Sequence, residues 1–192
     1  MIVALATPKL RAVRSLAGLL IVVAVLLAFA GAIKLSRPGP TTRALRAAGL
    51  PGSALFVRLL GLCEITVAVG ALALGSPVAM ALVAAFYLLF AGFILVALRR
   101  GAPISSCGCF GAQEAPPTLT HLVMNLAAAL VAGVAALGAG GRSGLGVPDG
   151  DGPLVLATFL FITAVAAWFS YVVLTLLPRV EAAAHQSAAS RR

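Results

Sequence analysis

The fold is decided by residues 54–98, which read ALFVRLLGLCEITVAVGALALGSPVAMALVAAFYLLFAGFILVAL. This stretch is apolar almost throughout and is interrupted near its middle by Gly75, Ser76 and Pro77. A helix that crosses a bilayer needs roughly 20 mostly apolar residues, and proline is tolerated at the start of a helix but disrupts its interior. The stretch therefore predicts two transmembrane helices, at 54–75 and 77–98, joined by a tight turn.

The composition of the whole chain supports a membrane protein. Hydrophobic residues make up 61% of the 192 residues and charged residues 10%, whereas soluble domains have about 45–50% and about 25%. Three further apolar runs predict spans at 15–35, 119–137 and 154–177. The expected fold class is all-α integral membrane, a helical bundle of four core transmembrane helices plus a fifth C-terminal one. A single membrane domain is expected over 1–178, followed by a polar, disordered tail at 179–192.

Polar side chains interrupt these spans on one side of the membrane. With five spans, the loops expected at 36–53 and 99–118 share a membrane face in either orientation. Five unusual residues fall toward that face: Lys34, Cys63, Glu64, His121 and Asn125. An ionisable residue inside a membrane is by default a candidate functional residue. We expect Glu64 either to pair with Lys34 or Arg58 and lock two helices, or to handle a proton or face a substrate.

The other members of this group have simpler explanations. His121 near the interface suits solvation or helix capping, with a chemical role as the alternative. Asn125 lies on the same helix face as His121, and asparagine in a span commonly bridges helices by hydrogen bonds. Cys63 is expected to be a small core residue, with a role as a third redox thiol as the alternative.

Two cysteines, Cys107 and Cys109, are separated only by Gly108. A structural zinc site needs four ligands, and only His121 is available nearby as a third, so a metal site is disfavoured. A disulfide across this spacing needs a bent backbone, which Gly108 permits and Gly111 extends. Strained disulfides are easily reduced. The spacing therefore favours a pair that passes a disulfide on rather than one that stabilises a fold.

The string Cys107-Gly108-Cys109-Phe110-Gly111 between two spans resembles the signature of the MauE branch of the DoxX/MauE superfamily. Two further strings resemble the same family: Gly31-Ala32-Ile33-Lys34-Leu35 at the end of the first span, and Gly49-Leu50-Pro51 in the segment that follows it. Glu64 with Gly70 in the second span, and Asn125 after the cysteine motif, complete the resemblance, which covers about 15–137.

The resemblance implies a bacterial, redox-associated membrane protein that matures the disulfide-rich small subunit of methylamine dehydrogenase. It implies thiol–disulfide exchange by Cys107 and Cys109 as part of an oxidoreductase, with a thioredoxin-like partner of the MauD type or a secreted disulfide-containing substrate. No cofactor and no metal are expected. The supporting residues would be Gly108, Phe110, Gly111, Lys34, Glu64, His121 and Asn125. The alternatives are a non-catalytic maturation scaffold and a transporter of small solutes or protons centred on Glu64.

Charge and chemistry give opposite orientations for the cysteine segment. The net charge of +9 comes from basic residues that flank the spans, which favours membrane lipids over nucleic acid as the partner. Most of these residues lie on the cysteine face, and the positive-inside rule would place that face in the cytoplasm. Disulfide chemistry for secreted proteins is extracytoplasmic. We expect a multi-pass protein of the bacterial inner membrane with the cysteine segment outside the cytoplasm.

Overall fold

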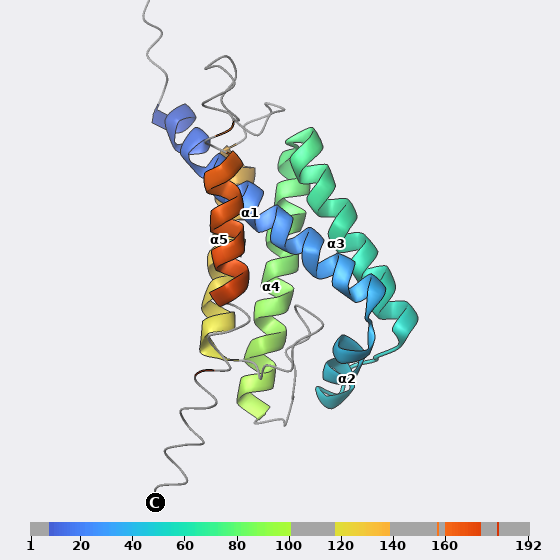
Figure 1. Ribbon diagram of the computed structural model, residues 1–192. Coiled ribbons are helices and arrows are strands. Elements are labelled where there is room, and N and C mark those ends of the chain that lie inside the picture. The colour runs from blue at the N-terminus through green and yellow to red at the C-terminus, as the bar shows by residue number, and fades with distance from the viewer. Residues whose placement is uncertain (1–7, 101–117, 139–156, 158–159, 174–179, 181–192) are drawn as a thin grey trace, which may run out of the picture.

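Every regular element that the structure describes is a helix. The computed structural model describes residues 8–100, 118–138, 157, 160–173 and 180 (Figure 1). The helices are α1 (Pro8–Ser36), α2 (Gly39–Ala47), α3 (Ala54–Leu74), α4 (Pro77–Arg100), α5 (Leu119–Gly138) and a shorter apolar helix, Leu160–Val173, here called the C-terminal helix.

Four of these helices are long and apolar enough to cross a membrane. The candidate spans are Ala17–Ser36, Ala54–Leu74, Pro77–Arg99 and Leu119–Gly138. They confirm the all-α membrane fold and agree closely with the four predicted core spans. The predicted fifth span at 154–177 is described over 160–173, where the helix is apolar but shorter than the other four. Its Tyr171 ring packs edge-on against Phe29 of α1, with 5.5 Å between ring centroids.

The turn between α3 and α4 forms as the sequence predicts. Gly75 ends α3 in the left-handed conformation, with φ of 57°, and its N–H donates to the carbonyl of Ala71. Glycine adopts this conformation without the steric cost that other residues bear. The Ser76 hydroxyl accepts a hydrogen bond from the N–H of Ala79 at 3.4 Å, which caps the first turn of α4. The two helices therefore run antiparallel without a longer loop.

The crossing of α1 and α3 depends on two glycines. A Cβ atom on Gly31 would lie 2.5 Å from the backbone oxygen of Gly61, and one on Gly61 would lie 2.6 Å from the oxygen of Gly31. Small residues allow membrane helices to approach this closely. Lys34 and Glu64 each follow one of these glycines by three residues, so the crossing brings their side chains to the same point.

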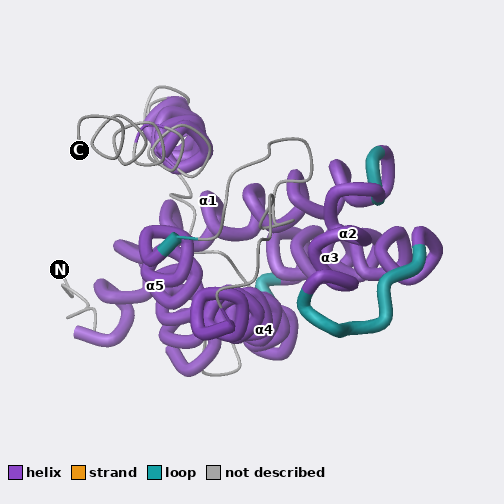
Figure 2. The backbone as a smooth tube through the Cα atoms, turned by 90° about the horizontal axis from the view of Figure 1, so that it is seen from below, coloured by secondary structure: helices purple, strands orange, loops and turns teal. Residues whose placement is uncertain are grey.

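One end of the bundle gathers the segments that matter for the site. There α1 and α4 end, α3 and α5 begin, and α2 lies between α1 and α3 in the chain (Figures 1 and 2). We call it the α2 end. The helix α2 corrects the expectation that 36–53 is a loop. Its Thr41 and Ala44 are buried whereas Arg43 and Arg46 are exposed, which is the pattern of a helix lying on an apolar surface.

Candidate functional site

The candidate site is built around an ion pair buried within the membrane-spanning region. Nζ of Lys34 on α1 lies 2.8 Å from Oε2 of Glu64 on α3, and their side chains are 2% and 0% exposed. This arrangement confirms the expected pairing with Lys34, whereas Arg58 is exposed. A buried pair needs good geometry and further hydrogen bonds to offset the loss of hydration.

The second carboxylate oxygen of Glu64 lacks such a bond. Within the described residues, Oε1 is buried and has no hydrogen-bond partner. A buried polar atom without a partner costs free energy, and such exceptions call for a functional explanation. Oε1 is chemically suited to take up a proton or to accept a hydrogen bond from a water or a ligand.

An aromatic ring of α4 completes this part of the site. Nζ of Lys34 lies 5.0 Å from the ring centroid of Phe90, within the range of a cation–π interaction. The sequence alone does not identify Phe90, because a phenylalanine in an apolar span carries no signal that a cation lies over its ring. Lys34 is thus held by α1, α3 and α4 together.

His121 and Asn125 lie near the start of α5, and both are buried. Nδ1 of His121 is 3.0 Å from the hydroxyl oxygen of Thr118 and hydrogen-bonded to it. Solvation of His121, one of the sequence-based expectations, is therefore wrong, because the ring lies inside the protein. Sequence analysis missed Thr118, although threonine is a preferred residue at the position just before a helix begins.

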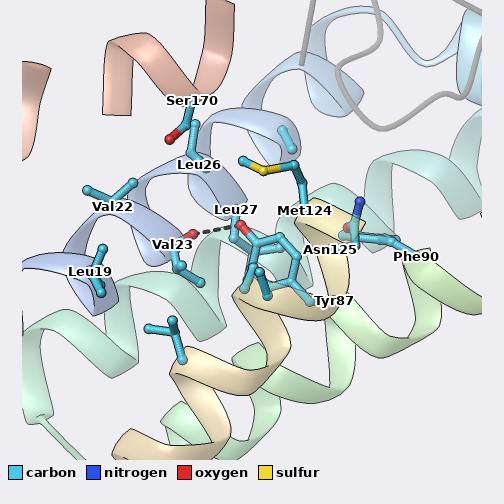
Figure 3. A pocket seen from close by; sticks show the side chains of 14 residues that line it. Leu19, Val22, Val23, Leu26, Leu27, Tyr87, Phe90, Met124, Asn125 and Ser170 are labelled. Atoms are coloured by element: carbon cyan, nitrogen blue, oxygen red, sulfur yellow. Dashed lines mark hydrogen bonds between the residues drawn. The ribbon is translucent and has the colours of Figure 1, made fainter. Parts of the chain in front are cut away.

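Asn125 bonds within its own helix. Its Nδ2 donates to the backbone oxygen of His121 at 2.7 Å, so the hydrogen bond described for it is local and differs from the expected bridge between helices. Its side chain also lies in the wall of a cavity of about 160 Å³ between α1, α4, α5 and the C-terminal helix (Figure 3). Phe90 contributes to the same wall, and Tyr87 donates a hydrogen bond to the backbone oxygen of Val23 there.

The sequence-predicted residues therefore divide into three groups. Lys34 and Glu64 are in contact, and Asn125 lies in the cavity wall that Phe90 shares. The expectation that Cys63 belongs to the core is wrong, because its side chain is exposed on α3. The motif residues lie outside the described residues: Cys107, Gly108, Cys109, Phe110 and Gly111.

The position of the motif in the chain still relates it to the site. The motif lies between the end of α4 and the start of α5, and both of these belong to the α2 end (Figure 1). In the part of the chain that the structure describes, no group of three or more His, Cys, Asp or Glu residues is placed to hold a metal ion.

Comparison with known families gives one match. The family model for the methylamine utilisation protein MauE matches residues 12–138. This range contains α2 and all four candidate spans and ends where α5 ends. Searches of curated proteins and of solved structures found no match.

Proposed function

This chain belongs to the MauE family, and from this membership we propose that it carries out thiol–disulfide exchange at the membrane through Cys107 and Cys109. The family relates the chain to membrane functions in methylamine utilisation, and the four spans make it a multi-pass membrane protein. The observation that carries the chemical proposal is the buried Lys34–Glu64 pair, in which Oε1 of Glu64 has no hydrogen-bond partner among the described residues.

The proposed exchange proceeds through a mixed disulfide. The thiolate of one cysteine attacks a sulfur of the partner's disulfide, which forms a new S–S bond and releases the partner's other sulfur as a thiolate. The second cysteine then attacks the mixed disulfide and releases the first partner sulfur. Two electrons pass to the partner, which becomes a dithiol, while Cys107 and Cys109 become a disulfide. The reverse sequence oxidises the partner.

Proton transfer gives the buried polar residues their proposed role. Each attacking thiol must lose a proton, and each released thiolate takes one up. The imidazole of His121 or the Oε1 atom of Glu64 serves as the group that accepts and returns this proton. Lys34 keeps the Glu64 side chain in place while its protonation changes.

The proposed partner is a thioredoxin-like protein or a secreted protein that contains a disulfide. In the MauE setting, this activity would mature methylamine dehydrogenase. The proposed location is the bacterial inner membrane, with the cysteine segment outside the cytoplasm because disulfides persist there. This orientation runs against the positive-inside rule, since Arg37, Arg43, Arg46, Arg58 and Arg99 are all exposed near that membrane face. We propose that these charges bind a partner or lipid headgroups and do not set the topology.

Labelling in intact cells tests the proposal directly. A membrane-impermeant maleimide is applied before and after mild reductant to a Cys63→Ser variant, in which only Cys107 and Cys109 can react. Labelling that appears only after the reductant supports an exposed, reducible disulfide. Labelling only after permeabilisation places the segment in the cytoplasm and reverses the proposed orientation. Thiols that label readily and never become oxidised contradict the redox function.

Variants separate this function from its alternatives. Cys107→Ser and Cys109→Ser should each abolish disulfide exchange while the protein still accumulates in the membrane. A scaffold would tolerate both changes and be sensitive to changes in 36–53. A transporter that depends on the unpartnered oxygen of Glu64 would tolerate both cysteine changes but lose activity in Glu64→Gln.

A further inference from the structure

A second cavity, of about 240 Å³, lies between α2, α3 and α4 at the α2 end. We call it the α2 groove. Its walls are mainly apolar and aromatic, and they include Leu45, Leu50, Phe56, Phe86, Phe90 and Phe93. Lys34 and Thr41 are the polar residues in its lining. Of these residues, the proposed disulfide exchange uses only Lys34, which keeps Glu64 in place.

The groove has the shape and the surroundings of a lipid-chain site. On α4, Phe86, Phe90 and Phe93 lie on one helix face, and the first and last are about 10 Å apart along the axis at 1.5 Å per residue. Leu89, which also lines the groove, is 66% exposed, so the cavity opens onto the outer surface of the bundle. Since α4 spans the membrane, this opening faces lipid.

The rim of the groove carries a fixed positive charge. Nε of Arg46 on α2 donates a hydrogen bond to the backbone oxygen of Gly52 at 2.7 Å. Gly52 belongs to the turn between Leu50 and Phe56, both of which line the groove. This bond holds the guanidinium beside the groove, and a guanidinium has further N–H donors for phosphate oxygens.

The protein supplies no acidic side chain to neutralise this charge in the part that the structure describes. Glu64 is the one acidic residue there, and it is buried against Lys34. The exposed arginines of the α2 end therefore lie at the membrane surface without a carboxylate partner among the described residues. Clusters of this kind beside transmembrane helices attract anionic lipid headgroups.

From these observations we propose that the α2 groove binds an anionic phospholipid, with one acyl chain between α3 and α4 and the phosphate at Arg46. The apolar walls contact the acyl chain by van der Waals packing, and the positive charge of Arg46 selects the headgroup. Arg46 then contributes to lipid binding, which is a reason for its position other than topology.

The test measures lipid binding to the full-length purified protein by native mass spectrometry in detergent. The probes are phosphatidylglycerol, which is anionic, and phosphatidylcholine, which has no net charge. The main variant is Arg46→Gln, because glutamine removes the charge and can still donate to Gly52. The matched control is Arg58→Gln, since Arg58 is exposed on α3 but lies two residues from Phe56 and so about 200° away around the helix.

Arg46→Gln should weaken phosphatidylglycerol binding about fivefold, the effect of one basic residue near an anionic surface, and leave phosphatidylcholine binding unchanged. Arg58→Gln should change neither. Leu89→Trp, which adds bulk to an exposed groove wall, should weaken the binding of phosphatidylglycerol without loss of folding. Equal binding of the two lipids, equal effects of Arg46→Gln and Arg58→Gln, or unchanged binding in Leu89→Trp would each overturn the proposal.

Discussion

Glu64 accepts a hydrogen bond from Lys34 at 2.8 Å in a place where neither side chain reaches solvent. The pair lies three residues beyond the contact of Gly31 with Gly61, so the close approach of the backbones and the meeting of the charges have one cause. Each charge is tolerated inside the bundle because the other is present. The pair should therefore behave as a unit when either residue is replaced.

Replacing Lys34 by Met should destabilise the protein by about 3–5 kcal/mol, because the change leaves the carboxylate of Glu64 buried without its cation. The double variant Lys34→Met/Glu64→Leu should recover much of this loss, since it removes both charges from the interior. The free energy of unfolding, measured by denaturation with SDS in mixed micelles, checks both values. A double variant as unstable as the sum of its single variants would show that the two side chains are energetically independent.

The helix crossing gives a prediction with internal controls. Gly31→Ala and Gly61→Ala should each destabilise the protein by about 1–3 kcal/mol, because the added methyl group would overlap a backbone oxygen that has little freedom to move. Gly92→Ala is the control, since a Cβ atom there meets nothing within 4 Å. It should be neutral or stabilising by up to about 1 kcal/mol, the usual gain in helix propensity.

Thermal unfolding of the three glycine variants in the same detergent checks this ranking. If Gly92→Ala lost as much stability as Gly31→Ala, an added methyl group would be harmful whether or not it meets another helix. The close approach of α1 and α3 would then not explain the loss of stability in Gly31→Ala and Gly61→Ala.

Sequence analysis predicted the fold better than the site, and the particular residues show why. A run of apolar residues long enough to cross the bilayer is a local property, and Gly75, Ser76 and Pro77 mark the turn between α3 and α4 without reference to any other helix. The short helix α2 was missed because its nine residues contain Pro40 and two arginines and resemble a loop in composition. Its amphipathic pattern becomes meaningful only when α3 and α4 supply the surface beneath it.

Contacts between helices were predicted only where charge made them necessary. Glu64 required a partner inside the membrane, and Lys34 was one of two candidates, so the pair could be anticipated. Phe90 under Lys34, the burial of His121 and the exposure of Cys63 depend on how each helix is rotated about its axis. Spans that are apolar on all sides contain little information about that rotation, which is why Cys63 was wrongly assigned to the core.

The exposed position of Cys63 leads to a third prediction. Cys63→Ser and Cys63→Ala should each change the free energy of unfolding by less than about 0.5 kcal/mol, as is usual for surface substitutions. Both variants should retain full disulfide exchange, because this thiol is exposed whereas Lys34 and Glu64 are buried. Thermal unfolding and the rate of exchange with a reduced or oxidised thioredoxin-like protein check the two statements. Loss of exchange in both variants would make Cys63 a third redox thiol.

The hydrogen bond between Thr118 and His121 yields the last prediction, which rests on the proposed disulfide exchange. If His121 transfers the proton, His121→Ala should slow exchange by about 100-fold, the lower end of what a general acid or base contributes. Thr118→Val should slow it less, because the ring is still present but has lost the hydroxyl that orients it. Thr118→Ser retains a hydroxyl and should remain close to the unmodified protein. Thr120→Val is the matched control, since it makes the same chemical change one residue before His121.

The decisive measurement is the dependence of the exchange rate on pH. An effect through His121 alters the pH profile in Thr118→Val and not in Thr120→Val, whereas a purely structural effect on the start of α5 lowers the rate equally at every pH.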